Sequence, residues 1–367
     1  MNVLLISSKP SNRGGIAIWV GQVLDYFRKH SELNVNIQNI SYRQYKKNGK
    51  HSITERIIVN GCDIFRILRE VASEILHKSI NVIHITGTGD WSLFRDIALM
   101  KFIRWKKIPI IYHLHFGRLA EYKNENGRNW KLLKLSIELA DEIWVLDRKT
   151  QEAISESFPD KKVVIMPNPI DETTIDISAC ENDNSIMYLG WVIKEKGIEE
   201  LLQVWRRVEE LYPVYTLKII GSYDESYLHY LQSTYETNRV HFLGLVSHEK
   251  AMLELKKTNL FVLPSYSEGF PYVILEAMMC KKPIVATNVG AIADMLSENC
   301  GCVIAPHNEE ELYDAIVKIL RNQEYSNNIA QNAFEKATAM YTISNVCAEY
   351  VKRWTKVKKR QLNQVML

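Results

Sequence analysis

Short apolar runs alternate with helix-like segments along most of the chain. In the first half the runs are VLLIS (3–7), VIHITG (82–87), IPIIYHLH (108–115), EIWVLD (142–147) and VVIMP (163–167), with helical patterns at 16–30, 90–106, 128–140 and 148–157. After the polar stretch 171–184 the rhythm restarts with SIMYLG, YTLKIIG, VHFLGLV, NLFVLP, PIVAT and GCVIA. Val- and Ile-rich strands that are each followed by a helix predict a parallel α/β sheet. We therefore expect two doubly wound domains that face each other across a cleft.

The polar stretch and the length of the chain set the expected domain boundaries. A chain of 367 residues favours about two domains. We expect a first domain over 1–175, a second over 176–345, and a C-terminal helix over 346–367 that crosses back to the first domain. That helix is amphipathic, with Val346, Tyr350, Val351 and Trp354 on one side.

Composition narrows the class of protein. A mean hydropathy of -0.18 with 46% hydrophobic residues is typical of a folded globular chain. No apolar run approaches a membrane span and no charged segment precedes the first strand, so we expect a cytosolic protein. The six Cys match no zinc or redox spacing and are interpreted as reduced thiols. Basic residues outnumber acidic ones in the first half, which fits an anionic membrane or acceptor, or an ordinary solvated surface.

The stretch EGFPYVILEA (268–277) carries two carboxylates, Glu268 and Glu276, with seven residues between them. Pro271 suits the first turn of a helix running to about 280, so Glu268 should lie on a loop and Glu276 inside the helix. Their carboxylates would stand roughly 10–15 Å apart, whereas a general acid and base acting on one bond stand about 5–9.5 Å apart. The larger spacing suits a ligand with hydroxyls at both ends and an anion between them, received by backbone N–H groups near Tyr272 and Val273. An exposed Glu and a capping Glu are the alternative interpretation.

The segment PSYSEGFPYVILEAM resembles the signature of the retaining glycosyltransferases of family 4, of bacterial surface-polysaccharide type. The resemblance extends over nearly the whole chain and implies the GT-B fold, two Rossmann-like domains. It makes the first domain the acceptor side and the second the nucleotide-sugar side. It also implies that Glu276 binds ribose hydroxyls, that Glu268 contacts the donor sugar, and that the backbone holds the sugar and diphosphate through Gly269, Phe270, Pro271, Tyr272 and Val273.

Stretches in the first domain fit the same pattern. Gly14 and Gly15 follow the first strand and open a helix, where a backbone can approach a phosphate closely. They are not part of a G-x-G-x-x-G motif, which counts against a nicotinamide cofactor. His113 and His115 point to the same side of a strand and would suit a metal, but no third ligand is apparent. The resemblance assigns His115 to the donor sugar or its leaving region, and His113 is interpreted as structural.

Further residues of the second domain complete the expected site. The resemblance places Gly190 near the donor and makes Lys196 the cation that neutralises the departing phosphate. Trp191 stands where the family usually has Arg, and either Lys194 or Arg13 would partly supply the missing charge or a backbone donor would replace it. The loop 244–247, including Val246, would pack on the base. Gly290 would allow close packing behind the site.

The resemblance therefore implies a metal-independent retaining transfer from a UDP- or GDP-linked sugar to a hydroxyl of a glycan or lipid-linked oligosaccharide. No cofactor and no nucleic acid partner is expected. The apolar and basic residues of 92–107 would dock on an anionic membrane at the inner face, or the segment is a helix packed on the sheet. A sugar-nucleotide epimerase of the same fold and a non-catalytic nucleotide-sugar binding module remain as alternatives, the latter because of Trp191.

Overall fold

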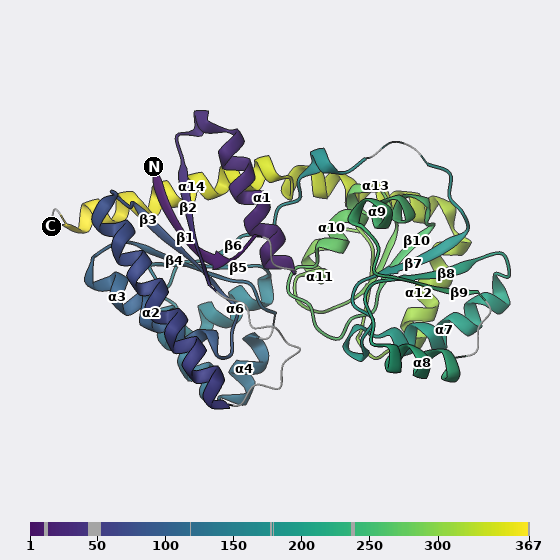
Figure 1. Cartoon of the computed structure of the whole chain (residues 1–367). Helices are drawn as coiled ribbons and strands as arrows, with labels where there is room; N and C mark the ends of the chain where they lie inside the picture. The colour runs from purple at the N-terminus through teal and green to yellow at the C-terminus, as the bar shows by residue number, and fades with distance from the viewer. Residues whose placement is uncertain are drawn as a thin grey trace. The chain divides into compact units, whose positions relative to one another are not determined.

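The structure is a computed structural model that describes residues 1–10, 14–42, 53–117, 119–176, 178, 180–235 and 239–365. The chain divides into two compact units (Figure 1). Unit 1 comprises Met1–Pro169 and Ile343–Leu367, and unit 2 comprises Ile170–Thr342. Each unit contains one parallel six-stranded sheet, which confirms the predicted pair of doubly wound α/β domains.

Unit 1 has the strand order β2-β1-β3-β4-β5-β6. Its strands are β1 (Asn2–Ser8), β2 (Asn36–Tyr42), β3 (Val82–Gly87), β4 (Ile110–Leu114), β5 (Glu142–Val145) and β6 (Val163–Ile165). Its helices are the 3-10 turn η1 (Ser31–Leu33), and α1 (Gly15–Lys29), α2 (Ile53–His77), α3 (Ser92–Trp105), α4 (Leu119–Glu125), α5 (Arg128–Leu139), α6 (Arg148–Ser157) and α14 (Ile343–Val365). The strand β2 is absent from the predicted set, because its sequence NIQNISY is largely polar. It lies at the edge of the sheet, where it pairs with β1 over its whole length.

The last helix, α14, packs on α1 and β3 of unit 1 (Figure 1). Its Tyr350 and Trp354 are almost completely buried. The indole Nε1 of Trp19, on α1, donates a hydrogen bond of 2.8 Å to the Tyr350 hydroxyl. A buried hydrogen bond between distant parts of the chain, combined with aromatic packing, fixes this helix against the first sheet.

Unit 2 has the strand order β12-β11-β10-β7-β8-β9. Its strands are β7 (Ser185–Leu189), β8 (Thr216–Ile220), β9 (Val240–Gly244), β10 (Leu260–Leu263), β11 (Ile284–Thr287) and β12 (Cys302–Ile304). Its helices are the 3-10 turns η2 (Glu172–Thr174) and η3 (Lys194–Lys196), and α7 (Ile198–Leu211), α8 (Glu225–Thr234), α9 (His248–Lys257), α10 (Tyr272–Met279), α11 (Ile292–Met295), α12 (Glu309–Arg321) and α13 (Gln323–Met340).

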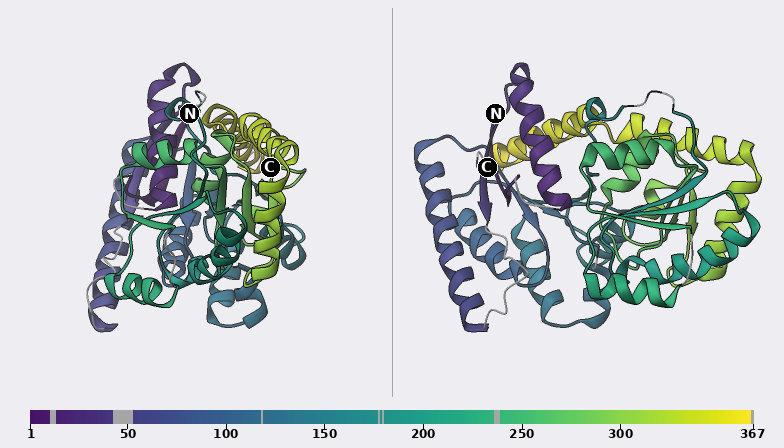
Figure 2. Two further views of the ribbon diagram at one scale, coloured as in Figure 1. Left: turned by 90° about the vertical axis from the view of Figure 1, so that its right-hand side faces the viewer. Right: turned by 45° about the vertical axis from the view of Figure 1, so that its right-hand side comes forward.

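The helices of unit 2 cover both faces of its sheet. Helices α9, α10 and α13 lie over one face, and α7, α8 and α12 lie over the other (Figures 1 and 2). The strand order reverses direction between β7 and β10, which are hydrogen-bonded neighbours. In open α/β sheets ligands bind beyond the carboxyl ends of the strands at such a switch point. The loops that follow β7 and β10 are therefore where a site is expected.

The segment 92–107 is mostly the helix α3. Its Leu93, Ile97, Met100 and Ile103 are buried in the core of unit 1. Phe94 and Trp105 are exposed, as is Trp91 just before the helix. This arrangement is that of a helix packed on a sheet, with a few aromatic side chains on its outer side. Among the helices that the structure describes, none combines the length and the apolar character needed to cross a bilayer.

Candidate functional site

The loops at the β7/β10 switch point converge on one ion pair. Lys196 ends η3, which follows β7, and Glu268 lies in the loop that follows β10. The Lys196 ammonium donates to Glu268 Oε1 at 2.6 Å, and the Ser265 hydroxyl donates to the same oxygen at 2.8 Å. The side chains of Lys196 and Glu268 are 21% and 14% exposed. Two residues that lie 72 positions apart in the sequence thus form one partly buried, polar contact at the edge of the sheet.

The two loops are fixed to each other through their backbones as well. The Tyr266 N–H donates to the Glu195 carbonyl at 2.9 Å. Gly197 has φ +68°, and a Cβ there would lie 2.1 Å from the Pro264 carbonyl oxygen. No side chain fits at that distance, so the start of α7 can approach the end of β10 only with glycine. The geometry of the Lys196 and Glu268 pair is therefore set by the backbone and not by the side chains alone.

A second close contact supports the Glu268 loop from behind. Gly290 has φ +53°, and a Cβ there would lie 2.3 Å from the Glu268 carbonyl oxygen. The Ala291 N–H donates to the Gly269 carbonyl at 2.8 Å. The close packing expected at Gly290 is present, and its partner is the loop that carries Glu268.

Helix α10 begins directly after this loop. Pro271 is its N-cap, and the helix runs from Tyr272 to Met279, so it begins one residue later than predicted. Phe270, Pro271 and Tyr272 are buried and Val273 is half-buried. The first N–H groups of any α-helix have no partner within the helix. The start of α10 therefore offers backbone donors and the positive end of its dipole next to Glu268.

Glu276 lies on α10 and is buried. Its Oε1 is 2.8 Å from Nε2 of His248, the first residue of α9. The side chain of His248 is 59% exposed. The hydrogen bond to Glu276 raises the pKa of His248, partial burial opposes that change, and the charges of Glu276 and Glu249 add to it.

His248 was not among the predicted site residues. It lies one residue beyond the loop 244–247 that was expected to pack on the base. Ser247 caps α9 by accepting a hydrogen bond from the Lys250 N–H, and this cap directs His248 toward its position in the first turn. A Ser followed by His at a strand-to-helix turn was the available signal, but no sequence rule connects His248 with a carboxylate 28 residues later.

The remaining predicted residues of unit 2 lie on the loops after β7 and β9. The Gly190 N–H donates to the Ile220 carbonyl at 2.9 Å. Trp191 is 53% exposed, and its carbonyl accepts a hydrogen bond of 2.8 Å from the Tyr188 hydroxyl. Val246 is half-buried and Lys194 is exposed. Arg13 lies outside the described residues.

The predicted residues of unit 1 lie near the carboxyl ends of β1 and β4. Gly14 is the N-cap of α1 with φ +111°, and both Gly14 and Gly15 are exposed. His115 follows β4, and its N–H donates to the Gly87 carbonyl at 2.9 Å. Its ring centroid is 4.8 Å from that of Trp19. Burial lowers the pKa of His115 to about 3, so its imidazole is neutral at physiological pH.

His113 belongs to a buried aromatic cluster between α1, α14 and the sheet of unit 1. Its Nδ1 is 3.3 Å from Nε2 of His84. Burial lowers the pKa of both rings well below the usual range. Although His84 supplies a third imidazole beside His113 and His115, no group of three or more His, Cys, Asp or Glu among the described residues is arranged to hold a metal ion.

The contact between His248 and Glu276 predicts a pH dependence of stability. Since the folded-state pKa of His248 is raised, the pair contributes fully below the usual value of 6.5 and the contribution is lost as pH rises through the raised pKa. Urea unfolding of wild type and His248→Gln should show the largest difference in unfolding free energy near pH 6 and a smaller one near pH 9. In a Glu276→Gln background this pH-dependent difference should disappear. A difference that grows with pH would contradict the assigned contact.

One family model matches most of unit 2. Residues 170–336 match the family model described as Glycosyl transferases group 1. The loop with Glu268, the helix α10 with Glu276, and Lys196 all lie inside the matched region.

Curated relatives are glycosyltransferases. The chain is 27% identical over 325 residues to an uncharacterized glycosyltransferase of Haemophilus influenzae, covering 84% of this chain and 81% of that protein. It is 25% identical over 253 residues to the putative teichuronic acid biosynthesis glycosyltransferase TuaC of Bacillus subtilis, covering 64% of this chain and 61% of that protein. An uncharacterized glycosyltransferase of Methanocaldococcus jannaschii is 25% identical, and 63% of its length is covered. The chain thus spans about three fifths of the length of the last two relatives.

Solved structures share the fold over nearly the whole chain. The sucrose-phosphate synthase of Thermosynechococcus elongatus superposes with a TM-score of 0.78 at 17% identity, covering 97% of this chain and 98% of that one. The Anabaena protein HepE, solved in complex with UDP-glucose, superposes with a TM-score of 0.70 at 16% identity, covering 97% and 100%. The chain therefore has the GT-B fold and glycosyltransferase homologues, and its residues 170–336 match the model of the group 1 glycosyltransferase domain.

Proposed function

We propose that the protein is a retaining glycosyltransferase that moves a sugar from a UDP- or GDP-linked donor to a hydroxyl of a glycan or a lipid-linked oligosaccharide. The observation that carries the proposal is the contact between Lys196 and Glu268 at the β7/β10 switch point, next to the start of α10. Cation, carboxylate and helix terminus there stand together inside a group 1 glycosyltransferase domain.

The two carboxylates can each accept a sugar hydroxyl. Among the described residues, the hydrogen bonds to Glu268 and to Glu276 all go to Oε1, which leaves Oε2 of each to accept from a ligand. Glu276 would bind the ribose hydroxyls and Glu268 a hydroxyl of the donor sugar. The backbone N–H groups at the start of α10 would hold the diphosphate between them.

The proposed chemistry places Lys196 at the leaving group. As the bond between the anomeric carbon and the phosphate oxygen breaks, negative charge grows on the diphosphate, and a fixed ammonium stabilises it. Glu268 and the Ser267 carbonyl, 3.5 Å away, orient Lys196. The acceptor oxygen would attack from the face that the diphosphate leaves, and a diphosphate oxygen would take its proton. With Lys196 and the helix dipole neutralising the charge, we propose that no divalent cation is required.

The comparisons support the donor and acceptor classes of this proposal. HepE was solved with UDP-glucose, and TuaC is named for teichuronic acid biosynthesis. A glycosyltransferase of Staphylococcus aureus that is 29% identical over 160 residues is named for capsular polysaccharide biosynthesis. We retain the predicted donor contacts of Gly14, Gly15 and His115 and a cytoplasmic location as parts of the proposal. Nothing in the structure explains why Trp191 replaces the Arg usual in family 4.

The role of Glu276 is tested by donor binding. A thermal-shift screen of UDP- and GDP-sugars first identifies the donor, since a ligand at about a hundred times its dissociation constant adds about 2.7 kcal/mol of stability. Glu276→Gln should then weaken donor binding by about 10- to 100-fold, because a strong acceptor for the ribose hydroxyls is lost.

The matched control for that test is Glu249→Gln, an exposed carboxylate on α9 that should leave the affinity unchanged. Assays of transfer with the identified donor should proceed in the presence of EDTA. Unchanged donor affinity in Glu276→Gln, with the variant folded by circular dichroism, would contradict the proposed role.

Membrane contact is a separate part of the proposal. Trp91, Phe94 and Trp105 are exposed on unit 1 at 57%, 41% and 72%, and Lys101 and Lys107 are exposed near them in the sequence. Exposed aromatic and basic side chains favour the interface of an anionic bilayer. The acceptor would then be lipid-linked.

Flotation with vesicles containing phosphatidylglycerol tests this contact. We expect the protein to float with the vesicles at low salt, and Trp105→Ser to reduce the floating fraction. Trp191→Ser, which removes an exposed Trp of unit 2, serves as the control and should float like the wild type. Wild-type protein that stays in the unbound fraction at low salt would end the membrane proposal.

A further inference from the structure

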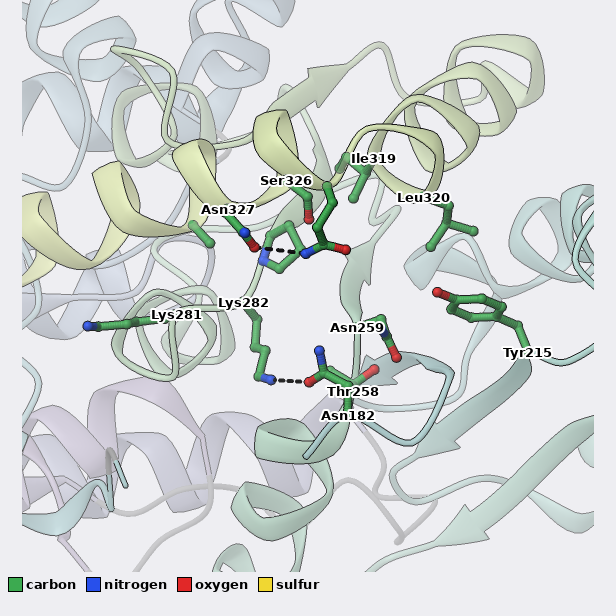
Figure 3. Close-up of a pocket in the computed structure, with 13 residues that line it drawn as sticks. Asn182, Tyr215, Thr258, Asn259, Lys281, Lys282, Ile319, Leu320, Ser326 and Asn327 are labelled. Carbon is green, nitrogen blue, oxygen red and sulfur yellow. Dashed lines mark hydrogen bonds between the residues drawn. The ribbon is translucent and has the colours of Figure 1, made fainter. Parts of the chain in front are cut away.

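A small cavity lies at the amino-terminal edge of the unit 2 sheet, the edge opposite to the Glu268 loop. Figure 3 shows its lining. Asn182, Tyr215, Asn259 and Lys282 each lie one to three residues before a strand, and the opposite wall comes from the end of α12 and the first turns of α13. Its volume is about 60 Å³. That space admits a ligand of a few heavy atoms.

Lys282 is a cation in this cavity, and no described carboxylate forms an ion pair with it. It is 8% exposed. Its ammonium donates to the amide oxygen of Asn182 at 3.0 Å, and no Asp or Glu is among the residues that line the cavity. The neighbouring cations differ, since Lys256 pairs with Asp176 and Lys218 pairs with Asp183. Burial lowers the pKa of Lys282 more than the charge of Asp183, which pairs with Lys218, raises it.

The amide side chains of the cavity have their acceptors occupied. The oxygen of Asn182 accepts from Lys282, that of Asn259 accepts from the Ser185 N–H at 3.2 Å, and that of Asn327 accepts from Gln323 at 2.8 Å. Among the described residues, none of these three NH₂ groups donates a hydrogen bond, so each is left to donate to a ligand. Figure 3 shows the Asn182 nitrogen directed away from Lys282 and into the space below α13. Asn259 is half-buried, and Asn182 and Asn327 are exposed. Amide donors beside a buried ammonium match an acceptor-only ligand.

We propose that this cavity binds a small oxyanion of phosphate size, held by the Lys282 ammonium and by the amide groups of Asn182, Asn259 and Asn327. The anion would supply the counter-charge that the protein does not, since a buried charge without a partner is costly. This site is distinct from the proposed donor site and does not depend on the proposed function. Lys282 follows the end of α10, and its N–H donates to the Ala277 carbonyl at 3.0 Å.

Amine labelling of the wild-type protein tests the site without any substitution. Acetic anhydride modifies free lysine amines, and peptide mass spectrometry reports each lysine separately. At constant ionic strength, inorganic phosphate at about ten times its dissociation constant should slow the labelling of Lys282 about tenfold, because roughly nine tenths of the sites are occupied. Labelling of Lys131, an exposed lysine of α5, should not change. Equal labelling of Lys282 with and without phosphate would overturn the proposal, and the dipole of α10 would then be what compensates Lys282.

Two variants with the same change of charge give an independent test. Phosphate should raise the melting temperature of wild type and of Lys131→Met, and should have no effect on Lys282→Met. An equal shift in all three proteins would show a general salt effect and contradict the site.

Repeating the titration with glycerol 3-phosphate identifies the source of the anion: tighter protection by the ester indicates a phosphate monoester, and tighter protection by the free ion indicates inorganic phosphate. UDP should not compete with phosphate for the Lys282 cavity. The result therefore tests the anion site even if the proposed donor site proves wrong.

Discussion

The ion pair between Lys196 and Glu268 is the contact on which the functional interpretation depends. It joins the loops after β7 and β10, the two strands between which the order of the unit 2 sheet reverses. A single salt bridge is weak evidence for stability, whether it is exposed or buried. Its importance is that it holds two side chains in fixed positions, because the close contacts at Gly197 and Gly290 fix the backbones of both loops. The protein thereby presents a cation and a carboxylate in a defined geometry at the end of a sheet where ligands bind.

The same edge of the sheet brings a helix terminus into the site. Helix α10 starts at Tyr272, immediately after the loop with Glu268, and carries Glu276 one turn further on. In a nucleotide sugar, carboxylates would accept hydrogen bonds from the hydroxyls of the two sugar rings, and backbone N–H groups would bind the charged diphosphate between them. His248 holds Oε1 of Glu276 from the side of α9, which fixes the rotamer of a carboxylate that would otherwise be buried without a partner.

Much of this architecture could be predicted from the sequence, for identifiable reasons. The buried strands are runs of Val, Ile and Leu, so their pattern predicts them, and Pro271 marks the start of α10 within one residue. The polar edge strand β2 has no such pattern and was missed. His248 was missed because its contact with Glu276 is set by how α9 and α10 pack, and spacing along the chain does not encode that. The cavity around Lys282 likewise depends on where α12 and α13 lie against the strand starts.

The central claim is that the loop with Glu268 and the start of α10 bind the donor. A crystal structure of the protein with a nucleoside diphosphate 2-fluoro sugar tests it most directly. The account predicts the diphosphate at the N–H groups of Tyr272 and Val273, the ribose hydroxyls within hydrogen-bonding distance of Glu276 Oε2, and the Lys196 ammonium near the phosphate that bears the sugar. A donor analogue bound away from the β7/β10 switch point, with Glu276 still in contact only with His248, would contradict it.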